Sequence, residues 1–219
     1  PHDHPRLLPP QAQRRPVQIV KHDDVRVDDF FWLRERDNPE VLAYLAAEND
    51  YTAQSMAHTA ALQGELYAEM LGRIRQTDES AALPEGSYWY YERTVEGQDY
   101  PILCRRCAPE AAEEVLLDVN LLAAGHPFCH LGEWRVSPDG RLLAYTLDTA
   151  GGEAFVVHIK ELASGELLPE RIPNAYYGLQ WADSQHLFYT QLGEAHRPES
   201  VWRHRLGDDP KADQRVLYE

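Results

Sequence analysis

The 219-residue sequence has few cysteines and no long apolar run. Three cysteines, Cys104, Cys107 and Cys129, do not build a disulfide framework, and so low a count favours a reducing compartment such as the cytoplasm. No apolar run approaches the roughly 20 residues that span a bilayer, and residues 1–16 lack the apolar core of a signal peptide. We therefore expect a cytoplasmic protein without a membrane-spanning segment.

Positive charge is also scarce. The chain has 21 Lys and Arg residues against 36 Asp and Glu residues, which gives a formal net charge of −15. Because so acidic a chain repels phosphate backbones, we expect no nucleic-acid partner. An acidic surface attracts cationic peptides, although solubility alone is the commoner reason for such a composition.

The motif that carries a hydrolase nucleophile is missing. Such a serine stands in Gly-x-Ser-x-Gly, because the strained turn from strand to helix needs glycines on both sides. The seven serines are Ser55, Ser80, Ser87, Ser137, Ser164, Ser184 and Ser200. None has glycine two residues before it and two residues after it, so we assign no catalytic residue and expect no cofactor.

One cluster has the spacing of a metal site. Cys104-x2-Cys107 is followed by His126-x2-Cys129, and paired ligands of this kind can bind zinc tetrahedrally. On a single strand, however, Cys104 and Cys107 point to opposite faces because their separation is odd. We therefore predict no metal here, and we also expect the neighbouring Arg105-Arg106 to be a solvated strand end rather than an anion site.

The first third of the chain has the periodicity of two helices. Asn38-Pro39-Glu40 is typical of a helix start, and apolar residues recur at helical spacing to about Met56. A second helix is predicted from about Thr59 to Arg75. Its apolar residues are Leu62, Leu66, Tyr67, Met70, Leu71 and Ile74. The two patterns predict a helical hairpin with an apolar stripe on each arm.

After Gly86 the period of the apolar residues changes to two. Predicted strands, separated by turns, cover 88–94, 100–107, 115–119, 134–136, 142–148, 155–160, 166–168, 180–181, 187–191, 201–206 and 215–218. The pairs Tyr145-Thr146 and Tyr189-Thr190 lie 44 residues apart. Short strands in a repeat of roughly 40–50 residues are typical of propeller blades, and a β-sandwich with regular turns is the alternative.

Many segments in order resemble the prolyl oligopeptidase family. Phe31-Trp32-Leu33-Arg34 is similar to an element near the start of that family, with one aromatic residue exchanged. The segments that resemble its oligopeptidase B branch are 38–45, 48–49, 88–91, 100–106, 114–120, 136–145 and 201–204. The resemblance runs from about residue 18 to the last residue. So many matching segments in the same order are a specific sign of this family, although no single segment is decisive.

The resemblance implies a mainly β fold with an N-terminal helical hairpin. Members of the family join a seven-bladed β-propeller to an α/β-hydrolase domain. Residues 1–77 would be an extension and hairpin that belong to the hydrolase domain, and residues 78–219 the first two to three blades. The Ser-Asp-His triad of the family follows the propeller, so the catalytic domain would be missing from this chain and the chain alone inactive.

The resemblance also implies substrates and partners. The oligopeptidase B branch cleaves short peptides after Lys or Arg, and its propeller restricts the access of large proteins. We expect the helical stripe of Leu62, Leu66, Tyr67 and Met70 to be exposed, because in the family its main partner is the hydrolase domain. In an open arc of blades, we expect the apolar side chains of 187–189 and 201–206 to line an exposed face, together with self-association. The alternatives are a β-repeat interaction module without enzymatic activity and a small zinc-stabilised β domain.

Overall fold

The computed structural model describes residues 7–219, and its contacts divide the chain into two compact units. The first unit ends at Ile74, and the second runs from Arg75 to Glu219. Each unit is described by itself.

The first unit begins with a β-hairpin that the sequence does not predict. β1 (Val17–Lys21) pairs antiparallel with β2 (Asp24–Asp28), and only His22 and Asp23 join them. Both joining residues have positive φ, 51° and 64°, as a type I′ turn requires. Turns of this type usually contain Asn-Gly or Asp-Gly, so this sequence lacks the usual signal of a hairpin.

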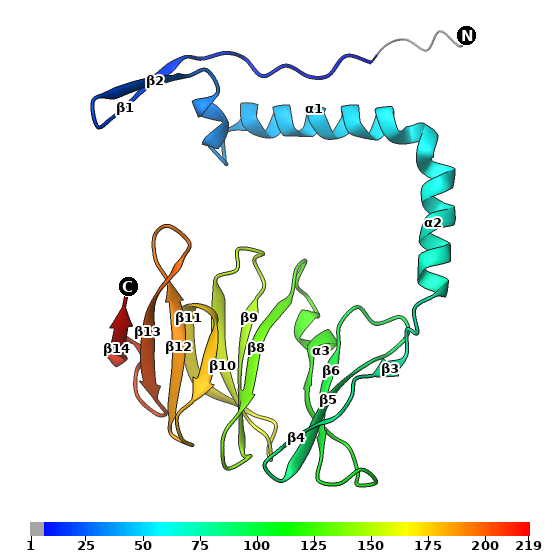
Figure 1. The fold of residues 1–219 in the computed structure, drawn as a ribbon, viewed down its shortest axis with the longest axis vertical. Coiled ribbons are helices and arrows are strands. Elements are labelled where there is room, and N and C mark those ends of the chain that lie inside the picture. The colour runs from blue at the N-terminus through cyan, green and yellow to red at the C-terminus, as the bar shows by residue number, and fades with distance from the viewer. Residues whose placement is uncertain (1–6) are drawn as a thin grey trace. The chain divides into compact units, whose positions relative to one another are not determined.

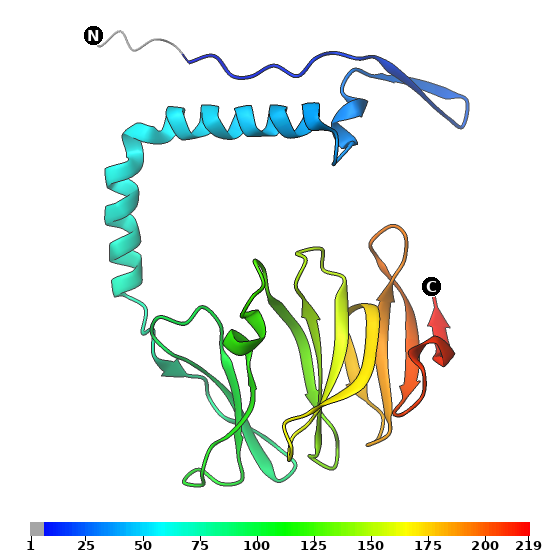
Figure 2. The same cartoon turned by 180° about the vertical axis from the view of Figure 1, so that it is seen from behind.

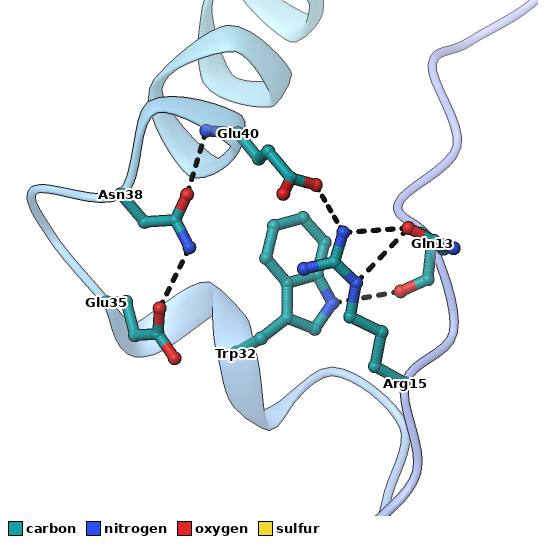
Figure 3. A network of polar contacts seen from close by, with 6 residues as sticks. All are labelled: Gln13, Arg15, Trp32, Glu35, Asn38 and Glu40. Carbon is teal, nitrogen blue, oxygen red and sulfur yellow. Dashed lines mark hydrogen bonds and ion pairs between the residues drawn. The ribbon is translucent and has the colours of Figure 1, made fainter.

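A polar network around Trp32 fixes the start of the first helix (Figure 3). Trp32 lies in the short helix η1 (Phe31–Arg34), and its indole N–H donates to the Gln13 carbonyl at 2.9 Å. The Arg15 guanidinium stacks 4.4 Å above the indole ring and pairs with the Glu40 carboxylate. The Asn38 side chain accepts a hydrogen bond from the Glu40 N–H at 2.9 Å, which is the predicted cap.

The predicted helical hairpin is confirmed. α1 (Pro39–Met56) and α2 (Ala60–Gly72) are joined by the short helix η2 (Ala57–Thr59), where Figure 1 shows the chain bending. Pro39 occupies the first helical position, where its missing N–H costs no hydrogen bond. None of the helices found between residues 7 and 219 has both the length and the apolar character needed to cross a membrane.

The second unit is built from antiparallel strands, and each predicted strand overlaps an observed one. Its elements are β3 (Asp78–Glu79), β4 (Leu83–Glu85), β5 (Tyr88–Thr94), β6 (Ile102–Arg106), β7 (Glu114–Asp118), α3 (Val119–Ala123), β8 (His130–Val136), β9 (Leu142–Asp148), β10 (Phe155–Glu161), β11 (Leu167–Trp181), β12 (His186–Leu192), β13 (Pro198–Arg205), η3 (Pro210–Ala212) and β14 (Gln214–Tyr218).

The strands form consecutive layers, seen side by side in Figures 1 and 2. β3 and β4 pair with β5, which is followed by β6 and β7, while β8 to β14 form one continuous series. The long β11 belongs to two layers, because its residues 167–175 pair with β10 and its residues 175–181 pair with β12. Asn174, with a φ of 58°, marks the change of partner. Pairing therefore repeats as a four-stranded antiparallel unit.

The two Tyr-Thr pairs mark equivalent positions of this repeat. Thr146 Oγ1 accepts the Glu133 N–H at 2.8 Å, and Thr190 Oγ1 accepts the Gly178 N–H at 3.0 Å. Opposite each threonine the first strand of the layer has an irregular register. A side chain at Gly178 would collide with Thr190, so the irregular register of β11 at this point needs glycine.

Apolar clusters between the layers form the core of the second unit. Leu103 and Leu116, from β6 and β7, pack against Leu143 and Tyr145 of β9. These four side chains are at most 1% exposed. The layers are therefore held face to face by side chains from segments far apart in the sequence.

One expectation for the last strands is wrong. The apolar side chains of 187–189 and 201–206 were expected to line an exposed face, but Leu187 is fully buried, Tyr189 is 3% exposed, and Val201, Trp202 and Leu206 are half-buried. Leu187 and Tyr189 face the preceding layer, where they pack in one cluster with Ile172. The exposed apolar side chains at this end belong instead to β14, namely Val216, Leu217 and Tyr218.

Candidate functional site

The serines of the described residues occupy turns, loops, helix α1 and strand β13. Ser137 is buried, and its hydroxyl donates to Asp139 Oδ1 at 2.6 Å and accepts the Leu142 N–H at 2.9 Å. These bonds close the turn between β8 and β9. That this chain holds no catalytic residue remains a prediction.

The predicted metal-ligand candidates are spread over different environments. Cys104 lies fully buried on β6, Cys107 is exposed just after it, His126 is exposed, and Cys129 is buried before β8. Burial raises the pKa of the Cys104 thiol to about 11, which keeps it protonated and a poor metal ligand. Within residues 7–219, no three His, Cys, Asp or Glu side chains lie close enough together to hold a metal ion.

Arg105 is not a solvated strand end. It is 4% exposed, and its guanidinium forms a bidentate pair with Glu114, with Nε and Nη2 at 2.7 and 2.9 Å from the carboxylate oxygens. Nη1 donates to the Gly140 carbonyl at 2.7 Å, and the guanidinium stacks 4.0 Å from the Tyr88 ring. Arg105 thus ties the first layer to the β8–β9 turn of the next layer.

A groove follows the seam between the first layer and β8. It contains three cavities of about 260, 540 and 330 Å³. Glu92 and Trp134 line the first two cavities, while Glu85, Tyr90 and Gln180 line the last two. Neighbouring cavities share these lining residues, so the three cavities lie in a row along β4, β5 and β8, and we call this row the groove. This is the candidate functional site of the chain.

Polar groups line the groove on the side of β8 and β11. Arg135 pairs with Glu133 at 2.8 Å, and its Nε donates to Gln180 Oε1 at 3.2 Å. Arg135 and Gln180 occupy equivalent positions, since Arg135 pairs with Ala144 and Gln180 with Phe188 in their ladders. The arrangement presents hydrogen-bonding groups beside aromatic walls, as a peptide-binding surface does.

A second buried polar cluster lies between the last two layers. His204 Nδ1 lies 2.7 Å from Asp213 Oδ1, and the Tyr189 hydroxyl donates to Asp213 Oδ2 at 2.9 Å. Burial, together with the hydrogen bond to Asp213, raises the pKa of Tyr189, so it stays a neutral donor. Because His204 is fully buried, we interpret this cluster as a structural link that holds the segment before β14.

His158 makes the stability of the second unit depend on pH. Its ring stacks on Tyr145 with centroids 5.2 Å apart, and burial and the nearby Arg171 charge lower its pKa from 6.5 to about 4. The unfolded chain then binds more protons than the folded chain between pH 6.5 and pH 4, so stability falls as pH falls through this window.

Replacing His158 by phenylalanine should remove this contribution. We expect the His158→Phe variant to lose less stability than wild type between pH 6.5 and 4, measured as the urea midpoint at each pH. The matched substitution of exposed His126 by phenylalanine shows the effect of merely losing a histidine. Parallel pH curves for wild type and His158→Phe would contradict the assignment.

The apolar stripe on α2 is exposed, as predicted. Leu62, Leu66, Tyr67 and Met70 are between 47% and 65% exposed. A continuous apolar face of this kind is typical of a surface that another protein part covers.

We expect this stripe to drive self-association. The double variant Leu66→Glu/Met70→Glu should stay monomeric at concentrations where the wild-type chain forms oligomers, measured by size-exclusion chromatography with light scattering. As a control for added charge, Gln54→Glu lies on the exposed part of α1. A wild-type chain that remains monomeric at high concentration would contradict this prediction.

Comparisons with known proteins cover almost the whole chain. The profile of the prolyl oligopeptidase N-terminal β-propeller domain matches residues 9–219. The chain is 40% identical to dipeptidyl aminopeptidase BI of Pseudoxanthomonas mexicana and 36% identical to protease 2 of Moraxella lacunata, in each case over 96% of this chain and 32% of the relative.

A solved structure of a family member also matches almost the whole chain. Oligopeptidase B from Leishmania major superposes with a TM-score of 0.91 at 29% identity, over 98% of this chain and 33% of that chain. The chain therefore spans about a third of the length of the relatives it matches. The layers described above are those of a β-propeller, and the chain belongs to the oligopeptidase B branch of the prolyl oligopeptidase family of peptidases.

Proposed function

We propose that this chain is the N-terminal propeller portion of an oligopeptidase-B-like serine endopeptidase that cleaves short peptides after Lys or Arg. The observation that carries the proposal is the match to oligopeptidase B over 98% of the chain, with a TM-score of 0.91. The repeated four-stranded pairing supports three blades, which would be the first three of the propeller.

The catalytic groups would come from a C-terminal α/β-hydrolase domain. Two observations support this division: the relatives are about three times longer than this chain, and no serine here has the Gly-x-Ser-x-Gly setting. The exposed stripe of α2 fits a contact with that domain. The propeller would restrict the access of large proteins, so that only short peptides reach the catalytic groups.

One relative suggests a different kind of cleavage. Its name, dipeptidyl aminopeptidase BI, describes removal of dipeptides from a free N-terminus. The rival proposal for this chain is therefore an exopeptidase of the same family. The two activities differ in whether they tolerate a blocked N-terminus.

A matched set of fluorogenic peptides tests the proposal. The gene product expressed to its natural stop codon is assayed with Arg, Lys, citrulline or Pro before the scissile bond, each with an acetylated and a free N-terminus. We expect cleavage after Arg and Lys, little after citrulline or Pro, and no need for a free N-terminus. Cleavage confined to free N-termini would favour the exopeptidase, and equal cleavage after citrulline would refute the preference for basic residues.

A further inference from the structure

The groove between the first layer and β8 is lined by aromatic rings. Tyr90 and Trp134 face each other across the seam, with ring centroids 6.2 Å apart, and Tyr88 lies 6.3 Å from Tyr90. Tyr100 lines the end of the groove nearest β6. Aromatic faces attract cationic groups and pack well on the aliphatic stems of Lys and Arg.

Two carboxylates in this groove have no cationic partner. Two other glutamates of the first layer are paired, Glu113 with Arg93 and Glu114 with Arg105. Glu85 and Glu92, which both line the groove, form no ion pair with any residue among 7–219. Two free carboxylates beside aromatic rings complement positive charge.

The strand register sets the spacing of these carboxylates. Glu85 pairs with Tyr88 in the ladder between β4 and β5, and Glu92 lies four residues beyond Tyr88 on the same strand. At roughly 3.4 Å per residue, the two positions are about 14 Å apart along the strand. In an extended peptide, residues four apart have the same separation and point to the same side.

We propose that this groove binds an extended peptide that carries two cationic side chains four residues apart. Glu92, with Trp134 and Tyr100, holds one cation, and Glu85, with Tyr90, holds the other. Arg135 and Gln180 supply hydrogen bonds to the peptide backbone. The choice of a peptide as the ligand rests on the proposed function, and the site would select basic peptides on the propeller itself, away from the catalytic groups.

Calorimetric titration of the 219-residue chain tests the groove. The probe is acetyl-Arg-Ala-Ala-Ala-Arg-amide, and the comparison peptides carry citrulline, which keeps the shape of arginine and removes its charge, at one or both arginine positions. We expect each citrulline to weaken binding by about threefold to tenfold. An Arg-Ala-Arg peptide should bind like the singly substituted peptide, because it spans only one carboxylate.

Variants assign the effect to the two carboxylates. Glu85→Gln and Glu92→Gln should each abolish the response to one citrulline, and the double variant should bind all peptides equally weakly. Glu166→Gln, at an exposed turn between β10 and β11, is the matched control and should bind as wild type does. Absence of binding at millimolar peptide, equal affinity for the citrulline peptides, or a double variant that still prefers arginine would overturn the proposal.

This outcome is separate from that of the proposed function. A gene product that cleaves after Arg while the isolated chain binds no arginine peptide refutes the groove alone. A chain that binds the arginine peptide while the gene product shows no preference for basic residues refutes the proposed specificity and leaves the groove in place.

Discussion

Replacing Leu103 by alanine is expected to lower the free energy of unfolding of the second unit by about 2–5 kcal/mol. Leu103 is fully buried on β6, where it packs with Leu143 and Tyr145 of β9. The substitution removes apolar contacts and leaves a cavity in the seam between two layers, which the rigid strands on both sides cannot close.

Leu121 provides the matched control. It lies on α3 and is 74% exposed, so Leu121→Ala should change the free energy of unfolding by less than about 0.5 kcal/mol. Both variants are compared by urea unfolding, followed by the fluorescence of the four tryptophans of residues 75–219. A difference of less than about 1 kcal/mol between the variants would mean that the seam does not hold the layers together.

Replacing Arg105 by methionine should cost about 2–4 kcal/mol. Methionine fills part of the volume, but the Gly140 carbonyl loses its donor and Glu114 loses its bidentate partner. Because the Glu114 side chain is 40% exposed, water solvates the remaining carboxylate in part, and we expect a loss at the lower end of the range for broken buried pairs.

Arg135 is the control for this substitution. Its side chain is 44% exposed and pairs with Glu133, so Arg135→Met should cost less than about 1 kcal/mol. Thermal unfolding of the two variants under the same conditions separates a buried link between layers from a surface ion pair. Equal losses for both would show that the contacts of Arg105 do not stabilise the fold.

The sequence predicts elements well where local signals are strong. Asn38-Pro39-Glu40 sets the start of α1, and the strand predicted at 142–148 coincides with β9. The β1–β2 hairpin is missed because His22 and Asp23 take positive φ without a glycine. β11 is predicted only at its two ends, since its middle changes partner near Asn174 and has no regular alternation.

Burial and the candidate groove depend on contacts that the sequence does not contain. Arg105 stands beside Arg106 at the end of a predicted strand, where an exposed arginine is expected. Only Glu114 and Gly140, from later segments, make it buried. The groove likewise joins Glu92 of β5 to Trp134 of β8. The alternation of Tyr88, Tyr90 and Glu92 on one face of β5 was a usable signal, but it does not reveal which surface that face meets.

The proposed function requires that the catalytic groups lie outside residues 1–219. The most direct test compares residues 1–219 with the gene product expressed to its natural stop codon, both assayed with a fluorogenic peptide that has Arg before the scissile bond. We predict hydrolysis by the gene product and none above background by residues 1–219. Hydrolysis by residues 1–219 that survives repeated purification, or a gene product that hydrolyses nothing, would contradict the account.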